Sequence, residues 1–407
     1  MSIAELNPYT IASRYDEIRV SPSKVLPLEV IVKIISHALT SKKICRKVDR
    51  TFCKATSEAY RKKVTARLTS LNPNSFREAS TKHLRFTRQN LSKESFLFKN
   101  LQKLDLSQCQ EQRYQWTFEQ IYDLISRCPN LQELNLGHCN LTDARLLLLP
   151  LPKTLKTLIL DNNSIEGYCF FKLNIPPNLH YLSFDTNKIT DEYLPQLKLP
   201  QTLEGINLNF NSITGSCFRD WQLPENLKTL CLISNQIKDE FLPFLELPQK
   251  FNELYLDFNE FFGTTFHLVE LPATLSVLGL CGNEITDESL VTLKFPPHLL
   301  RLDLESNQIT GSTFEEIEFP DTLKNLNLGM NEIDDLNLRH LKLPKALELL
   351  NLHHNNIEGG GLIEIQIPDS LQLLTISGNP IEDFEELLSI FPEELTIHFY
   401  SSAIDMV

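Results

Sequence analysis

The sequence of 407 residues predicts an α/β fold: about 12 coils of 24 residues stack into a solenoid around one curved parallel sheet, preceded by a small α-helical domain. Two observations predict it. Short apolar segments of the form LxxLxL recur every 24 residues from Leu155 to the copy that begins at Leu371, without an insertion. Residues 26–68 do not share this period, and their apolar residues instead follow helical spacing.

Each position of the repeat has a physical role. Alternating leucines predict a short strand with its apolar face inward, and the asparagine after it turns the chain and bonds backbone groups of neighbouring coils. A second apolar position and a proline lead into the next strand. One repeat cannot bury its own leucines, so the coils must stack. The pattern LxxLxLxxNxI, with earlier copies at Leu101 and Leu131, resembles the leucine-rich repeat.

A longer period of 48 residues lies above the first. The residue four places after the asparagine alternates between glycine and aspartate. We expect the glycine to take a positive φ and the aspartate to start a helical turn as its N-cap. The first copies differ, because Cys109 and Cys139 replace the asparagine, and "CPNLQELNLGHCNLTD" resembles the cysteine-containing class of these repeats. Residues 117–128 predict an amphipathic helix on the convex side.

The non-repetitive segment before the solenoid resembles an F-box. Leu26 and Pro27 with Glu29 match the LPxE opening of that motif, and Val48, Arg50 and Phe52 match its close, with Phe in place of the usual Trp. The predicted organisation is a tail (1–22), an F-box-like helical domain (23–70), a linker or capping region (71–100), the solenoid (101–394) and a C-terminal cap (395–407).

The resemblance implies a function as the substrate-recognition subunit of a Skp1-cullin-F-box ubiquitin ligase, with Skp1 bound by the F-box and a target protein bound by the solenoid. The residues that match the Skp1-binding positions of the family are Leu26, Pro27, Val30, Ile34, Ile35, Leu39, Val48 and Phe52. The alternative is an interaction scaffold or inhibitor without a ligase, in which the helices only cap the first coil.

Charge divides the chain into two parts. Residues 1–100 hold 20 Lys and Arg against 8 Asp and Glu, whereas residues 101–407 hold 19 against 44. The acidic solenoid repels phosphate backbones, so we expect no nucleic-acid binding there and a partner that is basic. The basic N-terminal cluster is interpreted as solvated helix faces, with complementarity to an acidic Skp1-like adaptor as an alternative.

The sequence lacks the motifs of an enzyme. Phosphate-binding glycine loops and nucleophile elbows are absent, and paired acids recur at one repeat position, as turn residues do. We expect no cofactor and no metal; His353 and His354 are adjacent in a strand pattern and should point to opposite sides. The 9 cysteines without metal-ligand spacing, and an N-terminus without a secretory signal or membrane span, predict a cytoplasmic protein, of a host cell if the source is a virus or an intracellular bacterium.

The predicted binding surface is the concave face, made by the third, fifth and seventh residues of each repeat when the first leucine is position 1. Aromatic and arginine side chains are favoured anchors in interfaces, and acidic residues surround them here. The candidate partner-binding residues are Tyr181, Asp185, Phe210, Tyr255, Asp257, Phe258, Arg301 and Asp303.

Overall fold

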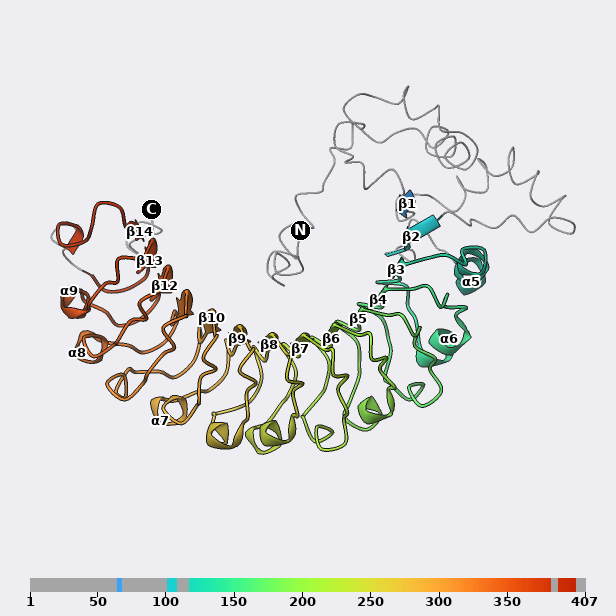
Figure 1. Cartoon of the computed structure of the whole chain (residues 1–407), viewed down its shortest axis with the longest axis horizontal. Helices are drawn as coiled ribbons and strands as arrows, with labels where there is room; N and C mark the ends of the chain where they lie inside the picture. The colour runs from blue at the N-terminus through green and yellow to red at the C-terminus, as the bar shows by residue number, and fades with distance from the viewer. Residues whose placement is uncertain (1–63, 68–100, 108–116, 382–386, 400–407) are drawn as a thin grey trace, which may run out of the picture.

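The computed structural model describes residues 64–67, 101–107, 117–381 and 387–399. These residues form an arc, with the strands along its inner, concave side and the helical turns on its outer, convex side (Figure 1). The strands make one 14-stranded sheet in which the order in space is the order in sequence. All pairings are parallel, so the arc is a solenoid, as the repeat predicts.

Strands β2 to β13 fall one to each predicted repeat, and equivalent residues of successive repeats pair with each other, as Leu254 of β8 does with Leu278 of β9. Most strands have three residues, because only the centre of each LxxLxL segment lies in the ladder. The strands are β1 (Val64–Arg67), β2 (Leu101–Asp105), β3 (Glu133–Asn135), β4 (Thr157–Ile159), β5 (Tyr181–Ser183), β6 (Gly205–Asn207), β7 (Thr229–Cys231), β8 (Glu253–Tyr255), β9 (Val277–Gly279), β10 (Arg301–Asp303), β11 (Asn325–Asn327), β12 (Leu349–Asn351), β13 (Leu373–Thr375) and β14 (Thr396–His398).

The convex side carries short helices. They are α5 (Phe118–Ser126), α6 (Asp143–Leu148), α7 (Asp287–Leu290), α8 (Asp335–Leu338) and α9 (Gly360–Glu364), with the 3₁₀ turns η5 (Leu194–Gln196), η6 (Asp239–Phe244) and η7 (Phe266–Leu268). The first of them, α5, confirms the amphipathic helix predicted at 117–128. Thr117 and Gln120 cap it reciprocally, and Ile121 and Ile125 are buried.

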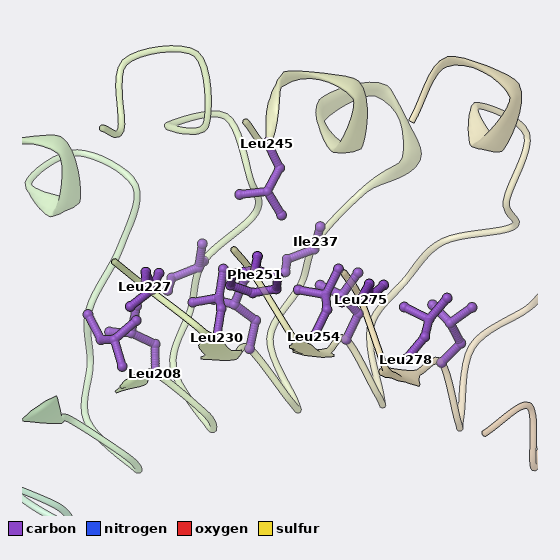
Figure 2. Close-up of a cluster of buried hydrophobic side chains, with 14 of the residues drawn as sticks. Leu208, Leu227, Leu230, Ile237, Leu245, Phe251, Leu254, Leu275 and Leu278 are labelled. Atoms are coloured by element: carbon purple, nitrogen blue, oxygen red, sulfur yellow. The ribbon is translucent and has the colours of Figure 1, made fainter. Parts of the chain in front are cut away.

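The core fills the space between the sheet and the convex turns. Figure 2 shows its repetitive construction, in which Leu230, Leu254 and Leu278 follow one another from coil to coil. These three side chains are buried, and Phe251 takes the place of a leucine in its coil without leaving the core. Because each coil buries its leucines against the next one, stability depends on stacking.

The predicted asparagine ladder is present behind the turns that follow β4 to β13, from Asn163 to Asn379. Asn259 is a typical member: its Nδ2 donates to the carbonyl oxygens of Leu232 (3.0 Å) and Leu256 (2.9 Å). Its Oδ1 accepts from the backbone N–H of Ile237, at 3.0 Å. Each such amide therefore joins two coils and satisfies buried backbone groups of both.

The alternating aspartates form a second ladder, on the convex side. Asp191 accepts at Oδ2 from the N–H and the hydroxyl of Thr214 (2.7 and 3.0 Å), and at Oδ1 from the N–H groups of Gly215 (2.9 Å) and Cys217 (3.1 Å). The N-cap prediction is wrong here. Asp239 and Asp287 are the first residues of their helical turns, and their carboxylates bind the next coil instead.

The alternating glycines complete this pair of coils. Gly311 has φ +86°, which confirms the predicted positive φ, and a Cβ built there would lie 2.7 Å from the ring of Phe314. Gly263 stands in the same relation to Phe266. Glycine is needed for two reasons, the left-handed backbone and the phenylalanine ring that covers it. Within each 48-residue pair, one coil supplies an aspartate carboxylate as the hydrogen-bond acceptor. The next coil supplies the backbone N–H groups that donate to it.

Each end of the sheet carries one strand beyond the predicted solenoid of residues 101–394. β1 lies within residues 23–70, predicted as helical, yet it pairs in parallel with β2. Val64 and Thr65 are β-branched, which favours a strand, and the pairing covers an edge of β2. β14 adds a further strand from the predicted C-terminal cap. The predicted Skp1-binding residues, Leu26 to Phe52, lie outside the described residues.

One buried polar group in the middle of the arc has no partner among the described residues. Trp221 is 4% exposed and stacks on Phe218, with ring centroids 6.2 Å apart. Its indole Nε1 makes no hydrogen bond. Within the part of the chain that the structure describes, no helix combines the length and the apolar character that a bilayer span requires.

Candidate functional site

The concave face follows directly from the strand geometry. In each three-residue strand the middle side chain points into the core, so the two flanking side chains point outward. In β8, Leu254 is 2% exposed, while Glu253 and Tyr255 lie on the concave side. Parallel, in-register pairing then aligns equivalent residues of successive coils in continuous columns along the arc.

The eight predicted binding residues fall into three groups by solvent exposure. Phe210 and Phe258 are the most exposed, at 53% and 46%. Four are partly buried and line the surface: Tyr181, Asp185, Arg301 and Asp303. Tyr255 and Asp257 are 9% and 2% exposed, so they form the floor of the face and offer little area to a partner.

A small apolar patch occupies the centre of the face and was missed from the sequence. Cys231 and Ile233 of one coil pack with Tyr255 of the next, and Val277 packs against them. The signal was present, since apolar residues stand at the fifth and seventh positions of this coil, where most repeats carry polar ones. The interface preference for aromatic residues and arginine does not single out a cysteine and an isoleucine.

Glycines in the concave columns make room for side chains of neighbouring coils. A Cβ built on Gly205 would lie 3.0 Å from the ring of Tyr181, which therefore covers that glycine. The carboxylate of Asp257 lies in the same way over Gly279, with a would-be Cβ 2.6 Å from its Oδ2. These contacts explain why Tyr181 and Asp257 are more buried than their outward direction suggests.

Carboxylates dominate the electrostatics of the face. Burial raises the pKa of Asp161 and of Asp257 to about 7, and it raises the pKa of Asp185, Asp303 and Glu253. The acids at concave positions of the described coils are Asp105, Glu133, Asp161, Asp185, Glu253, Asp257, Asp303 and Glu305, against the cations Lys103 and Arg301. The concave face is therefore acidic.

The C-terminal part of the face has a polar cluster. His353 Nδ1 lies 2.8 Å from the Oδ1 of Asn351, and its Nε2 lies 3.5 Å from the Oε1 of Glu305. The ring of His354 meets that of His353 edge to face, with centroids 5.3 Å apart. The expectation that these histidines point to opposite sides is wrong, because His354 follows the strand and has φ +49°.

The described residues offer little reactive chemistry. They contain no group of three or more His, Cys, Asp and Glu side chains placed to hold a metal ion. Cys231 and Cys281 are buried free thiols, and burial raises the pKa of both, which keeps them protonated and poorly nucleophilic. What this surface presents to a ligand is shape, charge and a few exposed apolar side chains.

Comparison with known proteins gives the following findings. A family model described as Leucine Rich repeat matches residues 127–144 and 295–312, so the chain carries leucine-rich repeats. No curated protein matches the sequence. Among solved structures, the chain is similar to one from an octameric complex of Latrophilin 3, Unc5D and FLRT2 (22% identity, 66% of this chain, 84% of that chain, TM-score 0.48). It is also similar to an internalin from Listeria monocytogenes (23%, 69%, 82%, 0.45) and to a leucine-rich-repeat protein from Leptospira interrogans (24%, 76%, 86%, 0.44).

Proposed function

We propose that this leucine-rich-repeat protein is a non-catalytic recognition protein whose concave face binds a protein partner rich in Lys and Arg. The observation that carries the proposal is the excess of carboxylates over cations along one continuous rigid surface. A curved sheet of this kind presents a broad preformed face, which lowers the entropy lost on binding. Complementary charge speeds association and selects the partner.

The buried concave acids strengthen this argument. Asp257 has one acceptor interaction with the next coil, at 2.9 Å from the N–H of Cys281, and burial raises its pKa to about 7. Near neutral pH its charge is thus poorly compensated by the protein itself. A partner ammonium or guanidinium group placed above it favours the ionised form and lowers its pKa, so ionisation and binding support each other.

Neutralising three partly buried carboxylates that line the concave face tests this function. The triple variant Asp185→Asn, Asp303→Asn and Glu305→Gln keeps the size of these side chains and one acceptor oxygen in each, and it removes three negative charges. A matched control, Asp220→Asn with Glu288→Gln and Glu315→Gln, removes three charges elsewhere on the solenoid. Proximity labelling in a eukaryotic cell should lose basic partners with the first variant and retain them with the second. Equal labelling by both would contradict the proposal.

We also propose that the F-box-like segment couples this recognition surface to a Skp1-like adaptor of a cullin ubiquitin ligase, in the cytoplasm of the cell where the protein acts. The support is the sequence match at Leu26, Pro27, Val48 and Phe52, placed directly before cysteine-type repeats. In this arrangement the solenoid selects the target and the ligase supplies the chemistry.

Coprecipitation with Skp1 separates this proposal from a scaffold or inhibitor without a ligase. The wild-type chain should bring down Skp1, and Leu26→Ala with Pro27→Ala should abolish that interaction, while Ser21→Ala with Ser23→Ala serves as the nearby control. Absence of Skp1 with the wild type, or its retention by the Leu26 and Pro27 variant, would leave the scaffold function. The outcome of the concave-face experiment does not depend on whether Skp1 binds.

A further inference from the structure

Large apolar side chains stand on one rim of the concave face, at the eighth repeat position just before the ladder asparagine. Every described residue at this position between 138 and 378 has a positive φ. The backbone there is left-handed, which Gly and Asn adopt readily and bulky residues rarely do. Asn162 fits this preference, whereas Phe210 (φ +52°) and Phe258 (φ +53°) do not.

Both phenylalanines are unfavourable for the fold in two ways. Their backbone is in a region that disfavours bulky side chains, and about half of each side chain is exposed, at 53% and 46%. Neither belongs to the buried core that joins the coils. A polar residue would serve the turn better, as Ser234 does in the coil between them.

The ring of Phe258 is held in place by the next coil. A Cβ built on Gly282, the eighth residue of that coil, would lie 2.3 Å from Phe258 Cδ1. The ring therefore lies against the glycine backbone, and this contact fixes its direction along the rim. A prepositioned aromatic side chain loses little entropy when it binds a ligand.

Spacing and charge indicate what the rim would bind. Phe210 and Phe258 are two coils apart, roughly 10 Å at the usual separation of neighbouring strands. Three residues of a polyproline II helix advance about 9 Å and complete one turn, so apolar side chains at i and i+3 meet both rings from the same face. Asp185 precedes Phe210 by one coil, and Glu305 follows Phe258 by two coils. Cations would therefore flank the apolar pair.

We propose that Phe210 and Phe258 anchor an extended protein segment in polyproline II conformation, with apolar residues at i and i+3 and Lys or Arg toward Asp185 and Glu305. This inference rests on the proposed function, because it specifies the kind of segment that the acidic face selects. The segment crosses the coils at right angles to the strands and contacts one rim of the face. The apolar pair gives affinity, and the flanking cations set direction and register.

Synthetic peptides test the spacing with the full chain. The main probe is a fluorescent nine-residue peptide rich in proline, with leucine at its third and sixth positions and lysine at each end. The controls are the same peptide with leucines at the third and fifth positions, the version with glutamate at each end, and a helical peptide with leucines seven apart. We expect the main probe to bind at least five times more tightly than each control, measured by fluorescence anisotropy.

Substitution by the residue that the turn prefers separates binding from folding. Phe210→Asn with Phe258→Asn should raise the Tm by about 2 °C per site, because backbone strain and apolar exposure are removed. The same double variant should lower the affinity for the main probe at least fivefold. His138→Asn, on the same rim and three coils before Phe210, should also raise the Tm and leave binding unchanged. Gly282→Asn should weaken binding by displacing the Phe258 ring.

The outcomes distinguish failure of the proposed function from failure of the polyproline II assignment. If the wild type binds no basic peptide, the proposed function and the rim both fail. If it binds basic peptides regardless of leucine spacing, or prefers the helical one, the acidic face stands and the polyproline II assignment fails. Retention of binding by the double Phe variant overturns the rim as the anchor.

Discussion

The aspartates of the convex ladder and those of the concave face are the same residue type in opposite situations. Asp191 is half-buried, and burial raises its pKa, but hydrogen bonds from Thr214 and Cys217 outweigh that and hold its pKa below the usual value. Burial raises the pKa of Asp257 to about 7, and the N–H of Cys281 compensates only in part. The number of hydrogen-bond donors that surround a buried carboxylate thus decides whether its charge stabilises or destabilises the folded state.

This difference separates structural acids from acids available to a ligand. The convex carboxylates have their acceptor positions filled by the next coil and hold pairs of coils together. Among the concave acids, Asp257 accepts one N–H from the next coil, and burial raises the pKa of Asp185, Asp257 and Asp303. Residues that the fold satisfies poorly are the ones expected at a binding surface.

Removal of a convex carboxylate should have the largest effect. Asp191→Ala leaves the N–H groups of Gly215 and Cys217 without their acceptor, so we expect a loss of about 3 kcal/mol in the free energy of unfolding at pH 7. The contribution is present above pH 3.8, the usual pKa, and disappears as pH falls through the lowered value in the folded state. Urea denaturation across pH measures it.

The control for this substitution is Glu284→Ala, which removes an exposed carboxylate and should change stability by less than about 0.5 kcal/mol. A similar small effect for Asp191→Ala would show that the convex ladder does not hold the coils together. The convex carboxylates would then have no structural role that distinguishes them from the concave ones.

The glycine partner of the convex ladder should show the next largest effect. Gly311→Ala forces a side chain into a backbone with φ +86° and toward the Phe314 ring, 2.7 Å away, so we expect a loss of about 2 kcal/mol. Gly360→Ala is the matched substitution in α9, where the nearest atom is 3.7 Å from the new Cβ. It should be neutral or stabilising by up to about 1 kcal/mol. Thermal unfolding distinguishes the two.

A concave substitution should act in the opposite direction from Asp191→Ala. The folded protein holds a proton on Asp257 up to about pH 7, whereas the unfolded chain releases it near pH 3.8, so wild-type stability falls as pH rises between these values. Asp257→Asn removes this loss, and we expect a gain on the order of 1 kcal/mol at pH 8 and no change at pH 4. A destabilised Asp257→Asn at pH 8 would contradict the role assigned to burial.

The sequence was sufficient for the features that depend on one coil and its neighbours. The 24-residue period places each strand, and the need to satisfy buried backbone groups predicts the asparagine ladder. The prediction that the alternating aspartates cap their own helical turns is wrong. An aspartate at the start of a turn suits an N-cap and a hydrogen bond to the next coil equally well, so the sequence does not distinguish the two roles. The burial of Tyr255 and Asp257 could not be predicted, since it depends on small residues such as Gly279 in the neighbouring coil.

The unpartnered indole of Trp221 gives the solenoid an optical signal of its own. The chain has 2 tryptophans, and the other, Trp116, lies outside the described residues. Trp221 is enclosed by apolar side chains in the middle of the arc, in the same coil as Phe210. With Trp116→Phe, its fluorescence would report the central coils alone, and a red shift on denaturation would mark their opening.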